Sequence, residues 1–329
     1  MDWSLVLNWA FVIALFTAAI RLAVPVLLAT LGEIVTERSG VMNLGLDGVM
    51  VVGGVSGFLV AYFLQSGPLA GISQWLGLLA GAAAGMLMGL IVAVFAVTLR
   101  ADQVITGVTL VVFGHGVGNY IYRQQFSSLT ARTNGLPVFE VPLLSQIPVI
   151  GDILFKHDPT VYITALLVLL VWFFLFRTTW GLNIRSVGEN PGAGETSGLR
   201  VAAVRYGATL IGTALAGFGG AVLTVVQLRM FREGIMGGRG WIAVALVIFA
   251  RWKPELALVG ALLFGLADAV QYRIQALSQV GRGAGTIPYE FLLMLPYVLT
   301  ILALLARSTR RGQAQAPEVL GRPYIKGEL

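Results

Sequence analysis

Residues 37–50 read "ERSGVMNLGLDGVM" and interrupt a chain that is otherwise strongly apolar. The stretch combines two charged residues, Glu37 and Arg38, with Asn43, Asp47 and three glycines. Glycine permits unwinding of the backbone, and unwound backbone is tolerated in hydrocarbon only where protein covers it or where it lines water. The stretch therefore predicts a broken membrane segment at a translocation pathway or gate.

A simpler interpretation of the same stretch is a tight loop at the cytoplasmic membrane surface. Glu33 and Glu37 would then lie one helical turn apart, and Arg38 would set the topology. For these three residues the loop interpretation is favoured. For Asn43 and Asp47 both interpretations stay open, because intramembrane polar residues are functional hypotheses by default.

The composition indicates that the solvent of this protein is a bilayer. Of its 329 residues, 57% are hydrophobic and 12% are charged, with a mean hydropathy of +0.83, whereas a soluble domain carries about 25% charged residues. Its 41 glycines suit close helix packing in membranes. The absence of cysteine excludes disulfides and thiolate metal sites. The net charge of +6 is scattered between apolar runs, which fits topology rather than nucleic-acid binding.

The apolar runs predict an all-α, polytopic helical bundle in one domain, residues 1–329, with about eight to ten transmembrane segments, some broken. A membrane-spanning helix needs about 20 apolar residues. The first run contains Arg21 and Pro25, which leave open a break into two short helices, and it shows no signal-peptide cleavage site. The runs are Trp9–Leu31, Val49–Leu64, Trp75–Leu99, Val104–Ile121, Thr160–Phe176, Tyr206–Val226, Leu256–Ile274, Ile287–Ala306 and the shorter Trp241–Ala250.

Basic residues predict the orientation, because cytoplasmic loops carry excess Lys and Arg. They place the loop 178–204 and the tail 307–329 in the cytoplasm, so the C-terminus is cytoplasmic, and the segment 123–158 lies outside. The loops alternate between the two sides of the membrane as required only if residues 241–250 cross the membrane. The glycine-rich stretch before them must then be unwound at membrane depth. Residues 40–54 and 234–250 share this pattern of glycine-rich polar sequence leading into an apolar helix, and transporters often contain such repeats.

Several polar residues fall inside the predicted spans, and each is interpreted first as a helix–helix hydrogen-bonding residue. His115 and Asn119 are four residues apart and share one helix face. Together with Asn43 and Asp47 they are the candidate substrate-pathway residues. His157 has no partner at metal-ligand spacing, so no metal site is expected. The polar residues of the spans are Gln103, His115, Asn119, Gln227, Asp268 and Gln271.

The stretch 180–205 is the longest polar segment assigned to the cytoplasm. Pro191 suits the first turn of a short helix, Asn190 suits its N-cap, and Gly198 could end it. A short charged helix between two spans favours docking of a soluble partner, and a solvated loop is the alternative. The chain contains no phosphate-binding G-x-x-x-x-G-K-[ST] stretch and no hydrolase motif, so we expect no enzyme activity and no cofactor.

Three segments resemble the permease subunits of ABC importers, in the group for branched-chain amino acid, simple-sugar and nucleoside uptake. They are "GEIVTERSGVMNLGLDGVMVVG", "GLNIRSVGENPGAGETSGL" and "GGRGWIAVALVIFARWKPELALVGALLFG". They look most like nucleoside or simple-sugar permeases that work with a basic-membrane-protein type lipoprotein receptor. Asp47 stands where many relatives have Glu, and "VIFARWKPE" stands where relatives often have a glycine-bearing turn. Both departures concern the substrate class rather than the fold.

The resemblance implies a bacterial inner-membrane importer subunit that carries a nucleoside such as guanosine, or a simple sugar. Its partners would be separate ABC ATPase subunits, a second permease of the same or another chain, and an extracytoplasmic substrate-binding lipoprotein. The ATPase-coupling residues would be Gly188, Glu189, Asn190, Pro191, Glu195 and Gly198. The alternatives are a passive channel or structural subunit and a self-contained ion-coupled secondary transporter, for which Asp268 is the best intramembrane carboxylate.

Overall fold

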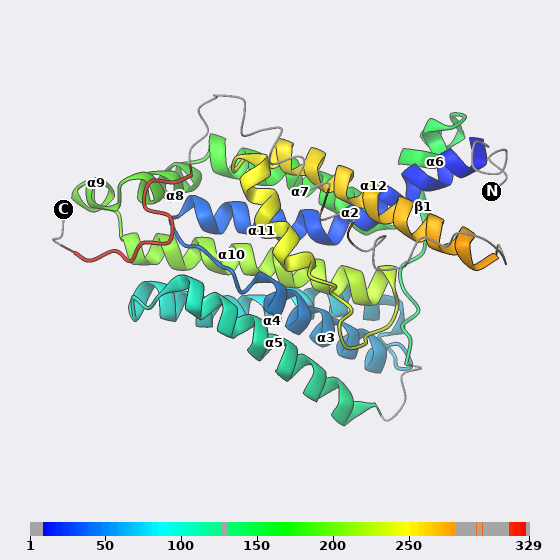
Figure 1. Ribbon diagram of the computed structural model, residues 1–329, viewed down its shortest axis with the longest axis horizontal. Helices are drawn as coiled ribbons and strands as arrows, with labels where there is room; N and C mark the ends of the chain where they lie inside the picture. The colour runs from blue at the N-terminus through cyan, green and yellow to red at the C-terminus, as the bar shows by residue number, and fades with distance from the viewer. Residues whose placement is uncertain (1–8, 127–130, 281–293, 295–297, 299–315, 327–329) are drawn as a thin grey trace.

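The computed structural model describes residues 9–126, 131–280, 294, 298 and 316–326. Figure 1 shows long helices packed side by side, and among the described residues two short strands pair with each other. In chain order the elements are α2 (Trp9–Arg38), α3 (Leu46–Leu64), η1 (Ala70–Ile72), α4 (Ser73–Ala93), η2 (Val94–Thr98), α5 (Gln103–Gln125), β1 (Phe139–Glu140), η3 (Leu144–Gln146), α6 (Ile150–Leu154), β2 (Lys156–His157), α7 (Pro159–Arg177), α8 (Thr179–Glu189), α9 (Pro191–Thr196), α10 (Val201–Ala221), η4 (Val222–Gln227), α11 (Arg239–Ala250) and α12 (Pro254–Val280).

Among the described residues, seven helical segments are long and apolar enough to cross a membrane. α4 and α10 have 21 residues each and continue into the π-helical turns η2 and η4. The shorter α11 has 12 residues. At 1.5 Å per residue it is about 18 Å long, a little more than half of the roughly 30 Å hydrocarbon core of a bilayer. The expectation of a polytopic all-α protein with some broken segments is confirmed. The predicted run Ile287–Ala306 lies outside the described residues, apart from positions 294 and 298.

Glycines bring α3, α4 and α10 into close contact at the centre of the bundle. A Cβ added at Gly53 on α3 would lie 2.5 Å from the Cα of Gly217 on α10. A Cβ at Gly217 would in turn meet the backbone of Gly81 and Gly85 on α4. These positions accept no side chain, so the three helices pack backbone to backbone, as small residues allow in membranes.

The first helix is continuous, so the break considered at Arg21 and Pro25 is not formed. Proline removes the N–H that would bond to the carbonyl four residues earlier, which here belongs to Arg21. The side-chain Nε2 of Gln227, at the end of η4, donates to that carbonyl instead. α2 therefore runs through Pro25 with the Arg21 carbonyl still paired.

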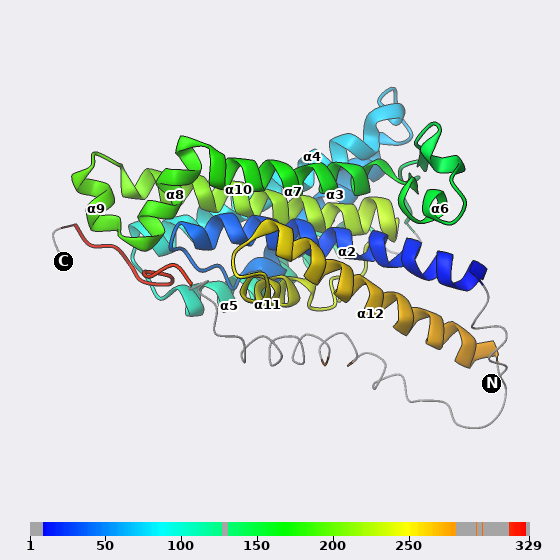
Figure 2. The same cartoon turned by 90° about the horizontal axis from the view of Figure 1, so that it is seen from above.

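The bundle has two different ends, which Figure 2 shows from above. At the α6 end, β1 pairs antiparallel with β2, with Phe139 opposite His157. His157 is buried, its Nε2 hydrogen-bonds the carbonyl of Ile153 at 2.7 Å, and burial lowers its pKa. At the opposite end, called the α9 end, α8 and α9 lie beside residues 316–326 (Figure 1).

Candidate functional site

The predicted break after α2 is real, and it is fully packed. α2 ends at Arg38, Gly40 takes a left-handed φ of +88°, and α3 begins at Leu46. Side chains satisfy the unwound backbone of residues 39–45, the first break. Glu33 Oε1 accepts from the N–H of Asn43 at 3.0 Å, and Gln103 Oε1 accepts from the N–H of Met42 at 2.7 Å. Unwound backbone at this depth survives because protein groups pair with it.

A second break, residues 228–238, precedes α11, and the first turn of α11 meets the first turn of α3. Gly238 is left-handed with φ +74°, and α11 starts at Arg239. The backbone N–H of Gly240 donates to Asp47 Oδ1 at 2.9 Å. A Cβ on Gly240 would overlap the backbone of Asp47, so only glycine allows this approach. The two stretches with a shared sequence pattern are thus joined in space at Asp47.

Asp47 links three helices through its two carboxylate oxygens. Oδ1 accepts from Gly240 at the N-terminus of α11, where the helix dipole favours negative charge. Oδ2 lies 2.8 Å from His115 Nε2 on α5. The side chain of Asp47 is 4% exposed, whereas that of His115 is 32% exposed. Asp47 therefore holds the junction of α3, α5 and α11, and His115 is the partner that solvent or a solute can reach.

The remaining pathway candidates, Asn43 and Asn119, also differ in how far they are buried. Asn43 is fully buried, and its Oδ1 accepts from the N–H of Gly45 at 3.0 Å, so it shapes the first break. Asn119 is half-buried on α5, one turn beyond His115. Phe113 and Tyr120 are exposed and share another face of α5, more than a quarter turn around the helix from Asn119. The structure brings Asp47 and His115 together and leaves Asn119 on the adjoining surface.

The loop interpretation of Glu33, Glu37 and Arg38 is wrong, because all three lie in the last turns of α2. Glu33 and Glu37 are 0% and 2% exposed. Trp252 Nε1 donates to Glu37 Oε2 at 2.5 Å, and the Arg38 guanidinium donates to the carbonyl of Trp252 at 3.2 Å. These bonds tie the end of α2 to the corner between α11 and α12, where Arg251 and Trp252 both have positive φ. The acids are packing groups rather than a solvated charge cluster.

A buried ion pair fixes the second break from the other side. Arg239 Nη2 lies 3.1 Å from Asp268 Oδ2 on α12, and both side chains are nearly inaccessible. Arg239 Nη1 also donates to the carbonyl of Met236 at 3.1 Å. The predicted role of Asp268 as a helix–helix contact is confirmed. Sequence reasoning missed its partner, because the pair joins residues on separate helices.

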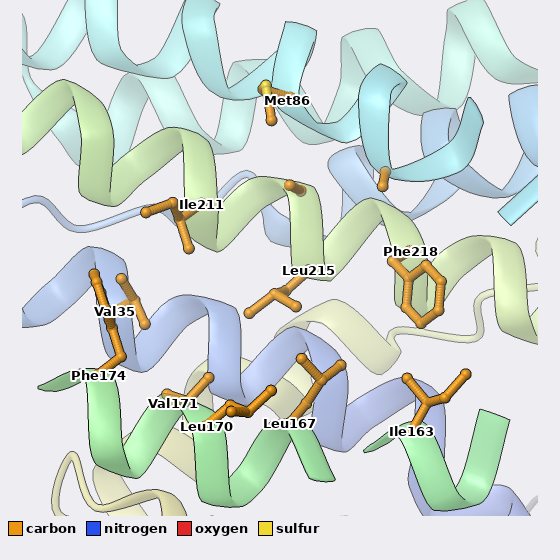
Figure 3. A pocket seen from close by; sticks show the side chains of 12 residues that line it. Val35, Met86, Ile163, Leu167, Leu170, Val171, Phe174, Ile211, Leu215 and Phe218 are labelled. Atoms are coloured by element: carbon orange, nitrogen blue, oxygen red, sulfur yellow. The ribbon is translucent and has the colours of Figure 1, made fainter. Parts of the chain in front are cut away.

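An apolar crevice of about 510 Å³ lies between α2, α4, α7 and α10. Figure 3 shows Val35, Leu167 and Phe218 among the side chains that line it. Every lining side chain is a hydrocarbon, an aromatic ring or the thioether of Met86. A hydroxyl-rich solute would lose its hydrogen bonds to water there without replacement, so this crevice is not the pathway of a polar solute.

The α9 end carries the short helix that the sequence predicted. Asn190 is its N-cap, with Oδ1 accepting from the N–H of Ala193 at 2.9 Å, and Pro191 occupies the first turn. Gly198 follows the helix with φ +86°. Glu189 is exposed, whereas Glu195 contacts Tyr324 and Lys326 near the C-terminus of the same chain. Gly188 packs directly on the backbone of Arg38, so α8 abuts the end of α2.

The helical bundle and its paired breaks define a polytopic membrane protein built like a transporter. Residues 15–304 match the family described as branched-chain amino acid transport system / permease component, and the chain belongs to this family.

Named relatives agree with this assignment. The putative glucose ABC transporter permease protein of Haloferax volcanii is 40% identical over 275 residues, 82% of this chain and 80% of that relative. The guanosine ABC transporter permease protein of Bacillus subtilis is 38% identical, over 94% of this chain and 96% of its own. The nucleoside ABC transporter permease protein of Lactococcus lactis is 36% identical over 92% and 94%. No solved structure matches.

Proposed function

We propose that this chain is the permease subunit of an ATP-driven ABC importer that moves a nucleoside inward. One observation carries the proposal beyond family membership: the helices that follow the two breaks meet at Asp47, beside a helix face that presents His115 and Asn119. Transporters place substrate sites where helices are broken. ATP hydrolysis takes place on separate ATPase subunits. A second permease and an extracytoplasmic binding lipoprotein complete the importer.

The nucleoside assignment draws on two features. Two relatives that align over more than 90% of this chain are named for guanosine or nucleoside transport. On α5, His115 and Asn119 share one face and offer hydrogen bonds to the polar edge of a base. A simple sugar is the second substrate class, because another relative is named for glucose. Uptake of labelled guanosine and labelled ribose by the intact importer decides between them.

The α9 end faces the cytoplasm in this proposal, as basic residues predict. It carries Arg177, Arg185 and Arg200, together with Arg322 and Lys326 of the tail. Segment 123–158, at the α6 end, then faces the binding lipoprotein outside the bacterial inner membrane. The chain has no cysteine, so single cysteines at two exposed or half-buried serines report sidedness cleanly. In intact cells, a membrane-impermeant maleimide should label Ser145→Cys and spare Ser197→Cys, and the reverse pattern would invert the topology.

The loop 178–204 couples the ATPase to the membrane domain in this proposal, with α9 as the docking helix. Replacing Glu189, Asn190 and Pro191 by alanine removes the exposed charge, the N-cap and the fixed first turn, and it touches no span. The variant should lose co-purified ATPase and solute uptake. The matched control is Lys156→Ala, which removes an ion pair with Asp152 at the α6 end and should leave both unchanged.

A well-expressed triple variant that keeps wild-type ATPase binding and uptake would show that α9 is only a solvated connector. Docking would then lie elsewhere, with Arg251–Glu255 as the next segment to test. Co-purification of the tagged wild-type chain identifies the partners directly, including whether the second permease is the same chain or another.

A further inference from the structure

Residues 316–326, here called the C-terminal clasp, join two segments that are far apart in the sequence. The N–H of Val319 donates to the carbonyl of Gly188 on α8 at 3.2 Å. The N–H of Gly321 donates to the carbonyl of Gly40 in the first break at 3.1 Å. In Figure 1 the red clasp runs past α8 at the α9 end of the bundle. One short segment is therefore bonded both to the proposed coupling loop and to the break that leads to Asp47.

The receiving surface is shaped for the clasp. Gly40 has φ +88°, and a Cβ there would lie 3.1 Å from Cγ2 of Val319. Arg205 on α10 is 1% exposed, and its Nη1 donates to the carbonyl of Arg322 at 3.2 Å. A guanidinium is costly to bury unless its hydrogen bonds are used. The clasp thus supplies an acceptor for a buried cation as well as packing for the first break.

The far end of the clasp holds α9 through one carboxylate. The Tyr324 hydroxyl donates to Glu195 Oε2, and Lys326 Nζ lies 3.0 Å from Glu195 Oε1. These two contacts lower the pKa of Glu195. In α9 itself only Pro191 and Gly194 are buried. A helix of six residues is too short to be stable alone, so it needs outside contacts to move as a unit.

We infer that the clasp is a mechanical link between α9 and the first break, with Tyr324 and Lys326 as positioning residues that act through Glu195. A displacement of α9 then reaches Gly40 through the clasp as well as through α8. From Gly40, seven residues lead to Asp47 and the junction of α3, α5 and α11. The inference rests on the proposed docking of an ATPase at α9.

The test compares Tyr324→Phe and Lys326→Glu with Arg322→Ala in the complete importer. Arg322 takes part through its backbone, whose carbonyl accepts from Arg205 and whose N–H donates to the carbonyl of Val319, so its side chain serves as the matched control. The first measurement is hydrogen exchange of α9 and of residues 39–43. The second is the ratio of solute imported to ATP hydrolysed, which a loss of expression alone does not change.

We expect Tyr324→Phe and Lys326→Glu to raise exchange in α9 and to lower the transport ratio, each by about two- to fivefold, the range for an exposed ion pair. Adding Glu195→Lys to Lys326→Glu should bring exchange in α9 and the transport ratio most of the way back to wild type, because the ion pair is rebuilt with reversed charges. Arg322→Ala should match the wild type.

The inference would be overturned if Tyr324→Phe and Lys326→Glu both kept the wild-type hydrogen exchange in α9 and the wild-type transport ratio. It would also be overturned if hydrogen exchange in α9 rose while the transport ratio stayed unchanged. Failure of the proposed ATPase docking would give a different result, because the wild-type chain would then bind no ATPase through α9. The hydrogen-exchange measurement would still report whether the clasp holds α9.

Discussion

Removing the Asp47 carboxylate should release the N-terminus of α11 from α3. Asp47→Ala deletes the acceptor of the Gly240 N–H and the partner of His115 at one stroke. The N–H left behind is buried, which costs about 1–3 kcal/mol. The charge-assisted hydrogen bond to the partly exposed His115 is also lost, which adds about 1.5–3 kcal/mol, for a total of about 3–5 kcal/mol. Asp47→Asn keeps an oxygen for Gly240 and loses only the charge, so it should cost less, about 1.5–3 kcal/mol.

The assay is the free energy of unfolding in lipid bicelles, measured beside ATP-driven uptake. The matched control is Asp102→Ala, because Asp102 also accepts a backbone N–H at a helix start, but at an exposed site on α5. That change should cost about 1 kcal/mol. Uptake should fall in the order wild type, Asp47→Asn, Asp47→Ala. If Asp47→Ala destabilises the protein no more than Asp102→Ala does, the carboxylate does not hold together the helices that follow the two breaks.

Three further predictions follow from the packing. Gly217→Leu should prevent assembly of α3, α4 and α10, because even a Cβ meets their backbone; a wild-type yield of monodisperse protein would contradict this. Asp268→Ala should cost about 3–5 kcal/mol by leaving Arg239 buried without its partner, and Asp268→Asn should cost less in the same unfolding assay. The clasp should loosen in acid: the pKa of Glu195 is lowered from its ordinary 4.5, so its contribution is complete above pH 4.5 and is lost as the pH falls through the lowered value. Hydrogen exchange in α9, corrected for intrinsic rates, should rise in the wild type as the pH falls through this lowered pKa, and it should not rise in Glu195→Gln.

Local sequence signals predicted most of the helices and the start of α9. Apolar runs of membrane length gave the spans, and Asn190 before Pro191 marked a helix start because an amide cap and a proline with fixed φ both suit that position. Gly40 marked the first break for a similar reason, since only glycine takes its backbone angle without strain. Each of these signals depends on neighbours a few residues away.

The errors concern partners that are distant in the sequence. Glu37 resembled a solvated loop residue because its partner, Trp252, lies 215 positions later. Pro25 resembled a helix break because the group that replaces its missing hydrogen bond, Gln227, lies 202 positions later in the chain and reaches the Arg21 carbonyl. Asp47 and His115 were both pathway candidates, and the structure pairs their side chains, yet the sequence did not reveal that Asp47 also holds Gly240. Such pairings depend on the fold and leave no local pattern.

The most direct test of the proposed function is uptake of labelled guanosine by proteoliposomes, with and without partners. Vesicles holding this chain with its co-purified ATPase, partner permease and binding lipoprotein should accumulate guanosine only when ATP is supplied. Vesicles holding this chain alone should accumulate nothing under a proton or sodium gradient. Gradient-driven uptake by the chain alone would contradict the account, and ATP-driven uptake of ribose with guanosine ignored would contradict its substrate.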